Sequence, residues 1–340
     1  MPNSTIIIDG YIGNYADLNG QHPFRISKTD IARGLITIGK THWLQYAKRP
    51  DRTILDFVHH WTGLSSYLRD FPNLRITQRY KDLDGSEKVA KSYQIGMGVA
   101  KIVAERKLRT PYLQHVDNLV KAGIVTLTAG TKERGDLVGL DTSDFWHVIE
   151  AKGRTGRPSS ADKKKAKDQA QRITVINRVA PATKSYCITS LSTVGTEIYL
   201  SDPDDLPALP AQLEIDQEKF LYVYYDKTFR SFYDLKPDNT IVFERYNLQF
   251  NLFKLNGSEF YLGLPDFFLR DLAQGKINFL EQRDEASQVF DRFPFLGLPG
   301  LSIGSDGVVL MKEGFLSKDY ALEFTKRRLG GGNIRLISGT

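Results

Sequence analysis

The sequence predicts a mixed α/β protein with an αβββαβ core, an N-terminal α/β segment and a C-terminal β-rich domain. Three observations predict this class. Of 340 residues, 41% are hydrophobic and 25% are charged, as in ordinary globular proteins. The middle of the chain alternates helical and strand-like patterns, and the residues after 213 alternate aromatic with polar positions. We therefore expect segments 1–87, 88–200 and 213–340, with the proline- and aspartate-rich stretch 201–212 as a linker.

The N-terminal α/β segment is expected to combine short apolar runs, such as STIIIDG at 4–10, with a helix over 52–69. The chain start lacks the basic and apolar regions of a signal peptide, and no stretch approaches the ~20 apolar residues of a membrane span. We expect no membrane association and a cytoplasmic location. Cys187 is the single cysteine, which excludes a disulfide framework or a cysteine-based zinc site within one chain.

The middle segment predicts the order helix, three strands, helix, strand. Residues 92–108 have helical spacing, interrupted by two glycines, and 111–123 begins with proline and ends with glycine, as helices do. Strands are expected over 124–130, 135–140 and 145–153, with a turn over 141–144. A serine-capped helix over 158–178 and a strand over 184–191 follow. Farther on, 219–235 and 240–264 are expected to be strands of a meander.

The chemistry is concentrated in HVIEAKGR, residues 147–154. Side chains two apart on a strand share a face, so Glu150 and Lys152 project together. Asp136 begins the preceding strand. If the hairpin pairs 136 with 150, the two carboxylates lie side by side, ~4.5–5.5 Å apart at Cβ. A register slip of one residue would turn Asp136 away and bring Asp141 into consideration.

Two carboxylates at that spacing repel each other unless a cation neutralises them. Mg²⁺ prefers one or two carboxylates together with water and phosphate oxygens. A lysine beside such an ion can orient a water molecule and stabilise the charge that develops during phosphodiester hydrolysis. The competing interpretation is a solvated hairpin edge that carries an ordinary Glu and Lys. Against it, Glu150 and Lys152 interrupt a strand that otherwise looks buried, and burying a charge is costly unless the charge is paired.

The stretch RGDLVGLDTSDFWHVIEAKGR, 134–154, resembles the core motif of the PD-(D/E)xK nuclease superfamily, whose fold is called restriction-endonuclease-like. The resemblance covers 105–191 and extends to neither 1–85 nor 213–340. It implies an αβββαβ core that uses Mg²⁺ or Mn²⁺, with Asp136 and Glu150 as metal-binding acids and Lys152 as the catalytic lysine. Gly135 stands where the motif has proline, a position that varies in the family.

The same resemblance points to further site residues. Many members add an acid from the first core helix, for which Glu105 is the candidate if that helix is 92–108; in 111–123 only Asp117 stands out. Some subfamilies use a glutamine on the helix after the lysine, and Gln169 is placed to face the site. Ile173 occupies the place of the tyrosine that follows such a glutamine in one subgroup.

A basic run follows the motif and predicts contacts with a phosphate backbone. It lies on the expected helix and the loop before it, with only Asp162 to offset it, and the whole chain carries a net charge of +6. A lysine-rich helix face can also be merely solvated, but its place beside the motif favours nucleic acid. The run comprises Arg154, Arg157, Lys163, Lys164, Lys165 and Lys167.

We therefore expect a Mg²⁺-dependent endonuclease. Duplex DNA is what most of the resembled superfamily cuts, while the residues themselves leave DNA and RNA open. Bacterial restriction or phage-defence effectors offer an analogy for the flanking segments, and many such nucleases form homodimers. The alternative is a catalytically inactive nucleic-acid-binding or sensor protein on the same fold.

Two other motifs do not predict a site. Adjacent His59 and His60 point to different sides of a helix, which argues against a shared metal ion, and the glycines at 96–98 and 330–332 are not followed by the Lys-Ser/Thr of a Walker phosphate-binding loop.

Overall fold

The protein is a mixed α/β molecule, and a computed structural model describes residues 3–38, 50–127, 135–202, 211–232, 236–243, 248–274, 300–315 and 334–338. Its helices are α1 Lys28–Ile38, α3 Pro50–Tyr67, α4 Gln78–Lys81, α5 Gly85–Lys107, α6 Val116–Lys121, α7 Ser160–Ala170, α8 Gln217–Phe229 and α9 Asp266–Ala273, with 3-10 turns η1 Gly13–Leu18 and η2 Arg230–Phe232. None of these helices is long and apolar enough to cross a membrane.

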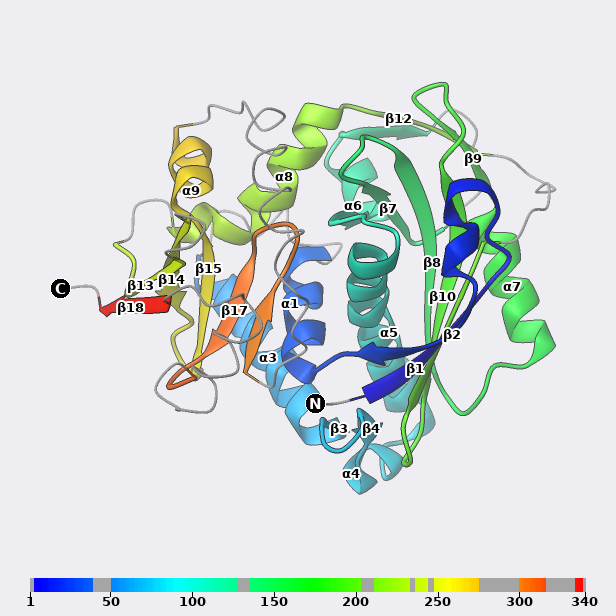
Figure 1. Cartoon of the computed structure of the whole chain (residues 1–340), viewed down its shortest axis with the longest axis horizontal. Helices are drawn as coiled ribbons and strands as arrows, with labels where there is room; N and C mark the ends of the chain where they lie inside the picture. The colour runs from blue at the N-terminus through cyan, green and yellow to red at the C-terminus, as the bar shows by residue number, and fades with distance from the viewer. Residues whose placement is uncertain are drawn as a thin grey trace.

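The largest of the described sheets has seven strands, in the order β2-β1-β11-β10-β8-β7-β5. β5, β7 and β8 form an antiparallel meander, and β10 returns parallel to β8. Figure 1 shows α5 on one face of this sheet and α7 on the other. The strands are β1 Asn3–Asp9, β2 Gly20–Arg25, β5 Tyr112–His115, β7 Leu137–Leu140, β8 Trp146–Thr155, β10 Thr183–Leu191 and β11 Thr196–Ser201.

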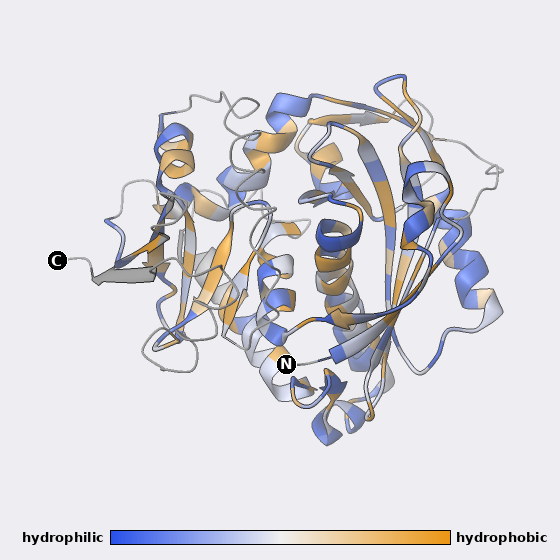
Figure 2. Ribbon diagram, in the orientation of Figure 1, coloured by the Kyte–Doolittle hydropathy of each residue, from blue (hydrophilic) through white to orange (hydrophobic). Residues whose placement is uncertain are grey.

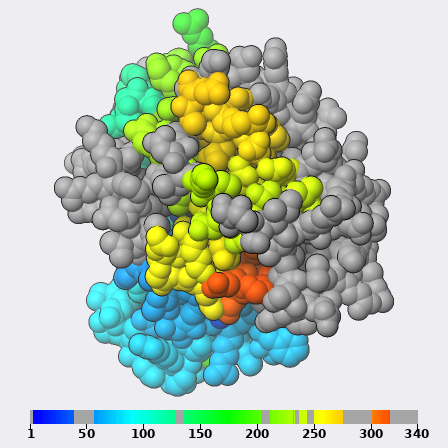
Figure 3. Space-filling model, turned by 90° about the vertical axis from the view of Figure 1, so that its left-hand side faces the viewer, coloured from blue at the N-terminus to red at the C-terminus, as the bar shows by residue number. Residues whose placement is uncertain are grey.

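Three smaller sheets complete the fold. β3 Leu68–Arg69 pairs with β4 Arg75–Ile76, and β12 Ala211–Ile215 lies between β6 Val125–Leu127 and β9 Ile173–Ile176. The C-terminal sheet is antiparallel, in the order β16-β17-β15-β14-β13-β18. Its strands are β13 Asn239–Phe243, β14 Leu248–Lys254, β15 Phe260–Pro265, β16 Leu301–Ile303, β17 Val309–Lys312 and β18 Ile334–Ser338. Figure 3 shows α9 and parts of this sheet on the surface, beside the N-terminal helices.

Helix α5 is the central element between the seven-stranded sheet and the C-terminal part of the chain. It packs on β8 and β10 on one side and on α1 on the other, and its residues from Ile95 to Glu105 are buried. Gly96 permits the approach to β8, because a Cβ there would lie 2.6 Å from the backbone nitrogen of Gly153. The glycine that weakens the helix prediction is thus required by close helix–strand packing. Figure 2 shows hydrophobic and hydrophilic turns along α5, whereas α7 is mostly hydrophilic.

A buried ionic network joins α5 to the C-terminal half. Arg33 of α1 forms ion pairs with Glu105 of α5 (2.9 Å) and with Asp306 in the β16–β17 turn (3.2 Å). Lys101 also lies 3.2 Å from Asp306, and the Tyr224 hydroxyl of α8 donates to that same carboxylate. All four ionic side chains are fully buried. Charges so deeply buried are tolerated only when paired, so the network specifies how the β16–β17 turn docks.

Several predicted elements are confirmed. The helices expected over 52–69 and 92–108 are α3 and α5, and the serine-capped helix is α7, with Ser159 and Asp162 forming a capping box. The strands expected over 135–140, 145–153 and 184–191 are β7, β8 and β10, and the 240–264 meander is present as β13, β14 and β15. β1 and β2 extend the large sheet, pairing through β11.

Other predicted elements are wrong. Residues 112–115 form β5 rather than the start of a helix, and the helix expected there is α6, which begins only at Val116. The strand expected over 124–130 is present as β6 but belongs to a small sheet, so β5 is the first of the three antiparallel core strands. α7 ends at Ala170, so 173–176 is a strand. The predicted strand 219–235 begins as helix α8, because Phe220, Tyr224 and Thr228 bury one helical face and Asp216 caps its start. Linker residues 203–210 and glycines 330–332 lie outside the described residues.

Candidate active site

The candidate site lies where β8 extends beyond β7. The ladder between β7 and β8 ends with Leu137 opposite Ile149, and one further step in the same register places Asp136 opposite Glu150. The Asp136 backbone N–H donates to Glu150 Oε2 (3.1 Å), and the Ala151 N–H donates to Asp136 Oδ2 (3.3 Å). The register is the one that the Asp136–Glu150 hypothesis requires. β8 continues to Thr155 paired only with β10 among the described strands, which leaves one edge open beside the two acids.

Lys152 lies on the same face of β8 as Glu150 and contacts it. Its ammonium group forms an ion pair with Glu150 Oε1. The Glu150 side chain is fully buried, whereas the Lys152 side chain is 34% exposed. The lysine therefore links a buried carboxylate to solvent, which is where a substrate would approach.

The two acids are electrostatically coupled. Burial raises the pKa of Asp136, against the opposing charges of Lys152 and His115. Burial and the Asp136 charge raise the pKa of Glu150, against the opposing charge of Lys152. Two carboxyl groups that resist simultaneous ionisation behave as a pair sharing a proton. A cation would replace that proton, so the pair is suited to holding a divalent ion.

Two residues that the sequence analysis did not select border this pair. Tyr93 of α5 is 42% exposed, and its hydroxyl lies 3.3 Å from Nε2 of His115, the last residue of β5. Burial, Asp136 and Glu150 raise the pKa of Tyr93, so its phenol stays protonated and able to donate. Sequence reasoning missed His115 because it placed this residue inside a helix. Asp117 also contributes to the field at Tyr93.

Gln169 lies on the α7 side of the site. Its Oε1 is buried and has no hydrogen-bond partner among the described residues. A Cβ on Gly135 would lie 3.9 Å from the Gln169 carbonyl oxygen, which places this part of α7 against the residue before Asp136. The same Cβ would lie 2.7 Å from Val148 Cγ1, so a larger side chain at 135 would clash. Gly135 in place of the motif's proline therefore has a steric reason.

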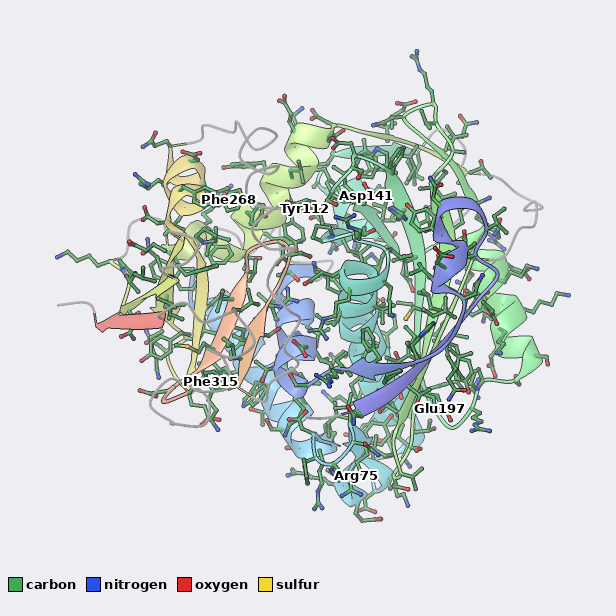
Figure 4. The ribbon with its side chains drawn as sticks, viewed as in Figure 1. Arg75, Tyr112, Asp141, Glu197, Phe268 and Phe315 are labelled. Atoms are coloured by element: carbon green, nitrogen blue, oxygen red, sulfur yellow. The ribbon has the colours of Figure 1, made fainter. Side chains whose placement is uncertain are left out.

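The two proposed additional acids are not brought to the pair. Glu105 lies twelve residues beyond Tyr93 on α5, about 18 Å along the helix axis, and is held by Arg33 and Lys101 in the buried network. Asp141 lies at the other end of β7, where Oδ1 accepts from Ser143 and Phe145 and Oδ2 contacts His147 at 3.2 Å. Figure 4 labels Asp141. Both acids have structural roles that account for their charge.

The basic run divides into paired and exposed members. Arg154 forms an ion pair with Asp162, and Arg157 with Glu197 (2.8 Å). Lys163 Nζ lies 4.9 Å from the centre of the Tyr199 ring. The exposed, solvent-facing members are Lys164 and Lys165 on α7, while Lys167 is half-buried. The helix thus presents positive charge beside the site, with its apolar side limited to Ala166 and Ala170.

The donor set fits a hard divalent ion with few protein ligands. Within the described ranges, no group of three or more His, Cys, Asp and Glu side chains is placed to hold a metal. His59 and His60 are likewise not part of such a group among the described residues. Mg²⁺ keeps several waters and is often bound through one or two carboxylates, which Asp136 and Glu150 supply.

No protein-family model matches the chain, and no curated protein or solved structure gives a significant match. Any functional conclusion therefore depends on the geometry and chemistry of the site itself.

Proposed function

We propose that the protein is a Mg²⁺-dependent nuclease that hydrolyses phosphodiester bonds in DNA, on a restriction-endonuclease-like core. The supporting observation is the arrangement of Asp136 and Glu150 across the end of one hairpin, with the Lys152 ammonium in contact with Glu150. The order α5, β5, β7, β8, α7, β10 agrees with the αβββαβ core that the motif implies.

Each side chain has a defined task in this proposal. Asp136 and Glu150 would hold Mg²⁺, which would neutralise the phosphate and activate water when bound. Lys152, at the boundary between burial and solvent, orients the attacking water and stabilises the negative charge that develops on the phosphate. The Tyr93 phenol would donate a hydrogen bond from the α5 side. The Gln169 amide, whose buried Oε1 has no partner among the described residues, would act from the α7 side.

A nucleic-acid substrate is proposed because the site lies beside an exposed basic helix, and duplex DNA is proposed because most of the resembled superfamily cuts it. Lys164 and Lys165 of α7 are available for phosphate contacts that carry affinity without sequence reading. Metal-independent nucleic-acid binding without cleavage is the outcome that would favour the inactive-relative hypothesis instead.

Cleavage assays with wild type, Lys152→Ala and Lys81→Ala test the proposal. Each protein is incubated with plasmid, linear duplex, single-stranded DNA and RNA, with Mg²⁺ or with chelator. We expect wild type and the exposed-lysine control Lys81→Ala to cleave DNA only with Mg²⁺. Lys152→Ala should lose at least about 100-fold in rate, as when one transition-state donor is removed.

Folding of each variant is checked by circular dichroism. Equal cleavage by wild type and Lys152→Ala, or cleavage that chelator leaves unchanged, would show that these residues are not the catalytic centre. Absence of cleavage of every substrate by the folded wild type would reject nuclease activity.

A further inference from the structure

A pocket of about 620 Å³, lined mainly by residues with polar side chains, lies on the same face of the large sheet as the candidate site. Its walls come from the first two strands, the ends of β10 and β11, and the turn after β8. Its volume is within the ~300–1,000 Å³ range of small-molecule sites. Nothing in the proposed catalytic mechanism uses it.

The sheet register connects this pocket to the catalytic strand. Arg154 of β8 is opposite Ser190, Ser190 is opposite Glu197, and Glu197 is opposite Thr5. Partners in register share one face, so this row runs from β8 directly into the pocket, which Ser190, Glu197 and Thr5 line. The neighbouring row begins at Lys152 and passes through Ile188 and Tyr199. The pocket floor and Lys152 therefore lie on one face of the sheet. Helix α7 covers Ile188 between them, so the solvent-exposed route from Lys152 to the pocket follows β8 past Arg154, whose side chain is 32% exposed.

The chemistry of the pocket is hydrogen bonding with little net charge. Arg157 is neutralised by Glu197, through contacts of 2.8 and 3.0 Å, and the Tyr199 hydroxyl donates to the same carboxylate (2.7 Å). The side-chain amides of Gln21 and Asn73 line the pocket and form no hydrogen bond within the described residues. Free amides beside a neutralised ion pair suit a nucleobase, whose edge offers both donors and acceptors, better than a phosphate.

The surroundings suggest where the ligand comes from. Gly156, at the pocket wall, lies four residues beyond Lys152, about 13 Å along an extended strand. Lys163 of α7 lies over Tyr199 at the border between the two. A DNA strand that leaves Lys152 would thus pass cationic side chains and then reach the amide groups of Gln21 and Asn73. Bases in a duplex are stacked and paired, so only an unpaired base can enter such a pocket.

We infer that this pocket binds an unpaired nucleotide of the substrate strand, next to the duplex held at the candidate site. The inference rests on the proposed function for its substrate class. It defines the preferred DNA as a junction between duplex and single strand rather than a blunt duplex.

Fluorescence anisotropy with labelled DNA hairpins, blunt or carrying a single-stranded tail, tests this in chelator, where no cleavage occurs. In wild type, the tail should strengthen binding by at least about fivefold, as for one stacked or bonded base. Gly195→Phe fills the pocket from its wall: a Cβ there lies 3.9 Å from Asn73, an ordinary contact. The double variant Gln21→Ala/Asn73→Ala removes the amides without filling it. Both variants should lose the gain in affinity that the single-stranded tail provides, called the tail increment, and should keep binding to the blunt hairpin.

Gly85→Phe is the matched control, since a Cβ there meets nothing within 4 Å and the residue lies outside the pocket; it should keep the increment. A missing increment in wild type, or one that survives Gly195→Phe, overturns the inference. Because binding is measured without metal, a pocket-dependent increment in a protein that cleaves nothing would reject the nuclease proposal alone. Cleavage without any increment would reject the pocket inference alone.

Discussion

At the scale of one residue, burial of the Glu150 carboxyl group lowers the stability of the protein as pH rises. Its side chain is fully buried, and burial together with Asp136 raises its pKa above the ordinary value of 4.5. The folded protein therefore holds this proton to a higher pH than the unfolded chain does. Between those two pKa values the folded state binds more protons, so the free energy of unfolding falls as pH rises. An acid buried in this way is typical of a site built for something other than stability.

We predict that Glu150→Gln weakens this pH dependence in metal-free buffer. Between about pH 5 and pH 8 wild type should lose on the order of 2 kcal/mol more stability than the variant. Chemical denaturation at the two pH values measures the difference. Added Mg²⁺ should stabilise wild type at the higher pH but not the variant, through binding to the folded state alone. Equal pH slopes would show that Glu150 is not the responsible group.

Helix α7 has one buried side and one charged side, and the two have different tasks. Ala166 and Ala170 pack on Tyr186 and Ile188 of β10, while the capping box at Ser159 defines where the helix begins. The small alanines let the helix lie close to the sheet, next to Gly135 and the acid pair. Its exposed lysines, Lys164 and Lys165, are the ones that the proposed nuclease would use to contact DNA.

We predict that Lys164→Ala/Lys165→Ala weakens DNA binding equally for all sequences. Each lost phosphate contact should reduce the slope of log affinity against log salt by roughly one, so the double variant should lose about two. Anisotropy titrations over a range of salt concentrations measure the slope. Arg79→Ala/Lys81→Ala removes equal charge from the exposed side of α4 and should leave the slope unchanged. A slope equal to wild type in the α7 variant would place the DNA elsewhere.

At the scale of the whole molecule, α5 couples the candidate site to the C-terminal half. Its N-terminal part carries Tyr93 beside the acids, and its C-terminal part carries Lys101 and Glu105 in the ionic network. Asp306 balances Arg33 and Lys101 from a turn more than 200 residues later. The C-terminal half is therefore held against the same helix that borders the site.

We predict that Asp306→Ala destabilises the protein by about 3–5 kcal/mol, because it leaves two buried cations, Arg33 and Lys101, with Glu105 as their one remaining shared acid among the described residues. Urea denaturation measures the loss. Asp17→Ala, at an exposed position, should change stability by less than about 0.5 kcal/mol. A change equally small for Asp306→Ala would mean that water reaches the network and that the turn is not tightly docked.

Local patterns were sufficient for much of the site. Alternation in HVIEAKGR placed Glu150 and Lys152 on one strand face, and the hairpin between 136 and 150 is short enough that its register follows from the apolar pattern. The same local logic failed at 112–115 and 219–229. A four-residue strand followed by one helical turn has no distinct period, and aromatic residues at helical spacing can resemble strand alternation.

The sequence by itself determined the mixed α/β class, the hairpin that carries Asp136, Glu150 and Lys152, and the positive helix beside it, because these depend on residues close together in the chain. Only the tertiary structure decided that Glu105 pairs with Arg33, that Tyr93 and His115 border the acids, and that β1, β2 and the turn between β10 and β11 form a pocket on the same sheet face as Lys152. Those contacts join segments far apart in the chain, and the free energy that selects among them comes from burial and charge pairing, which no local pattern records.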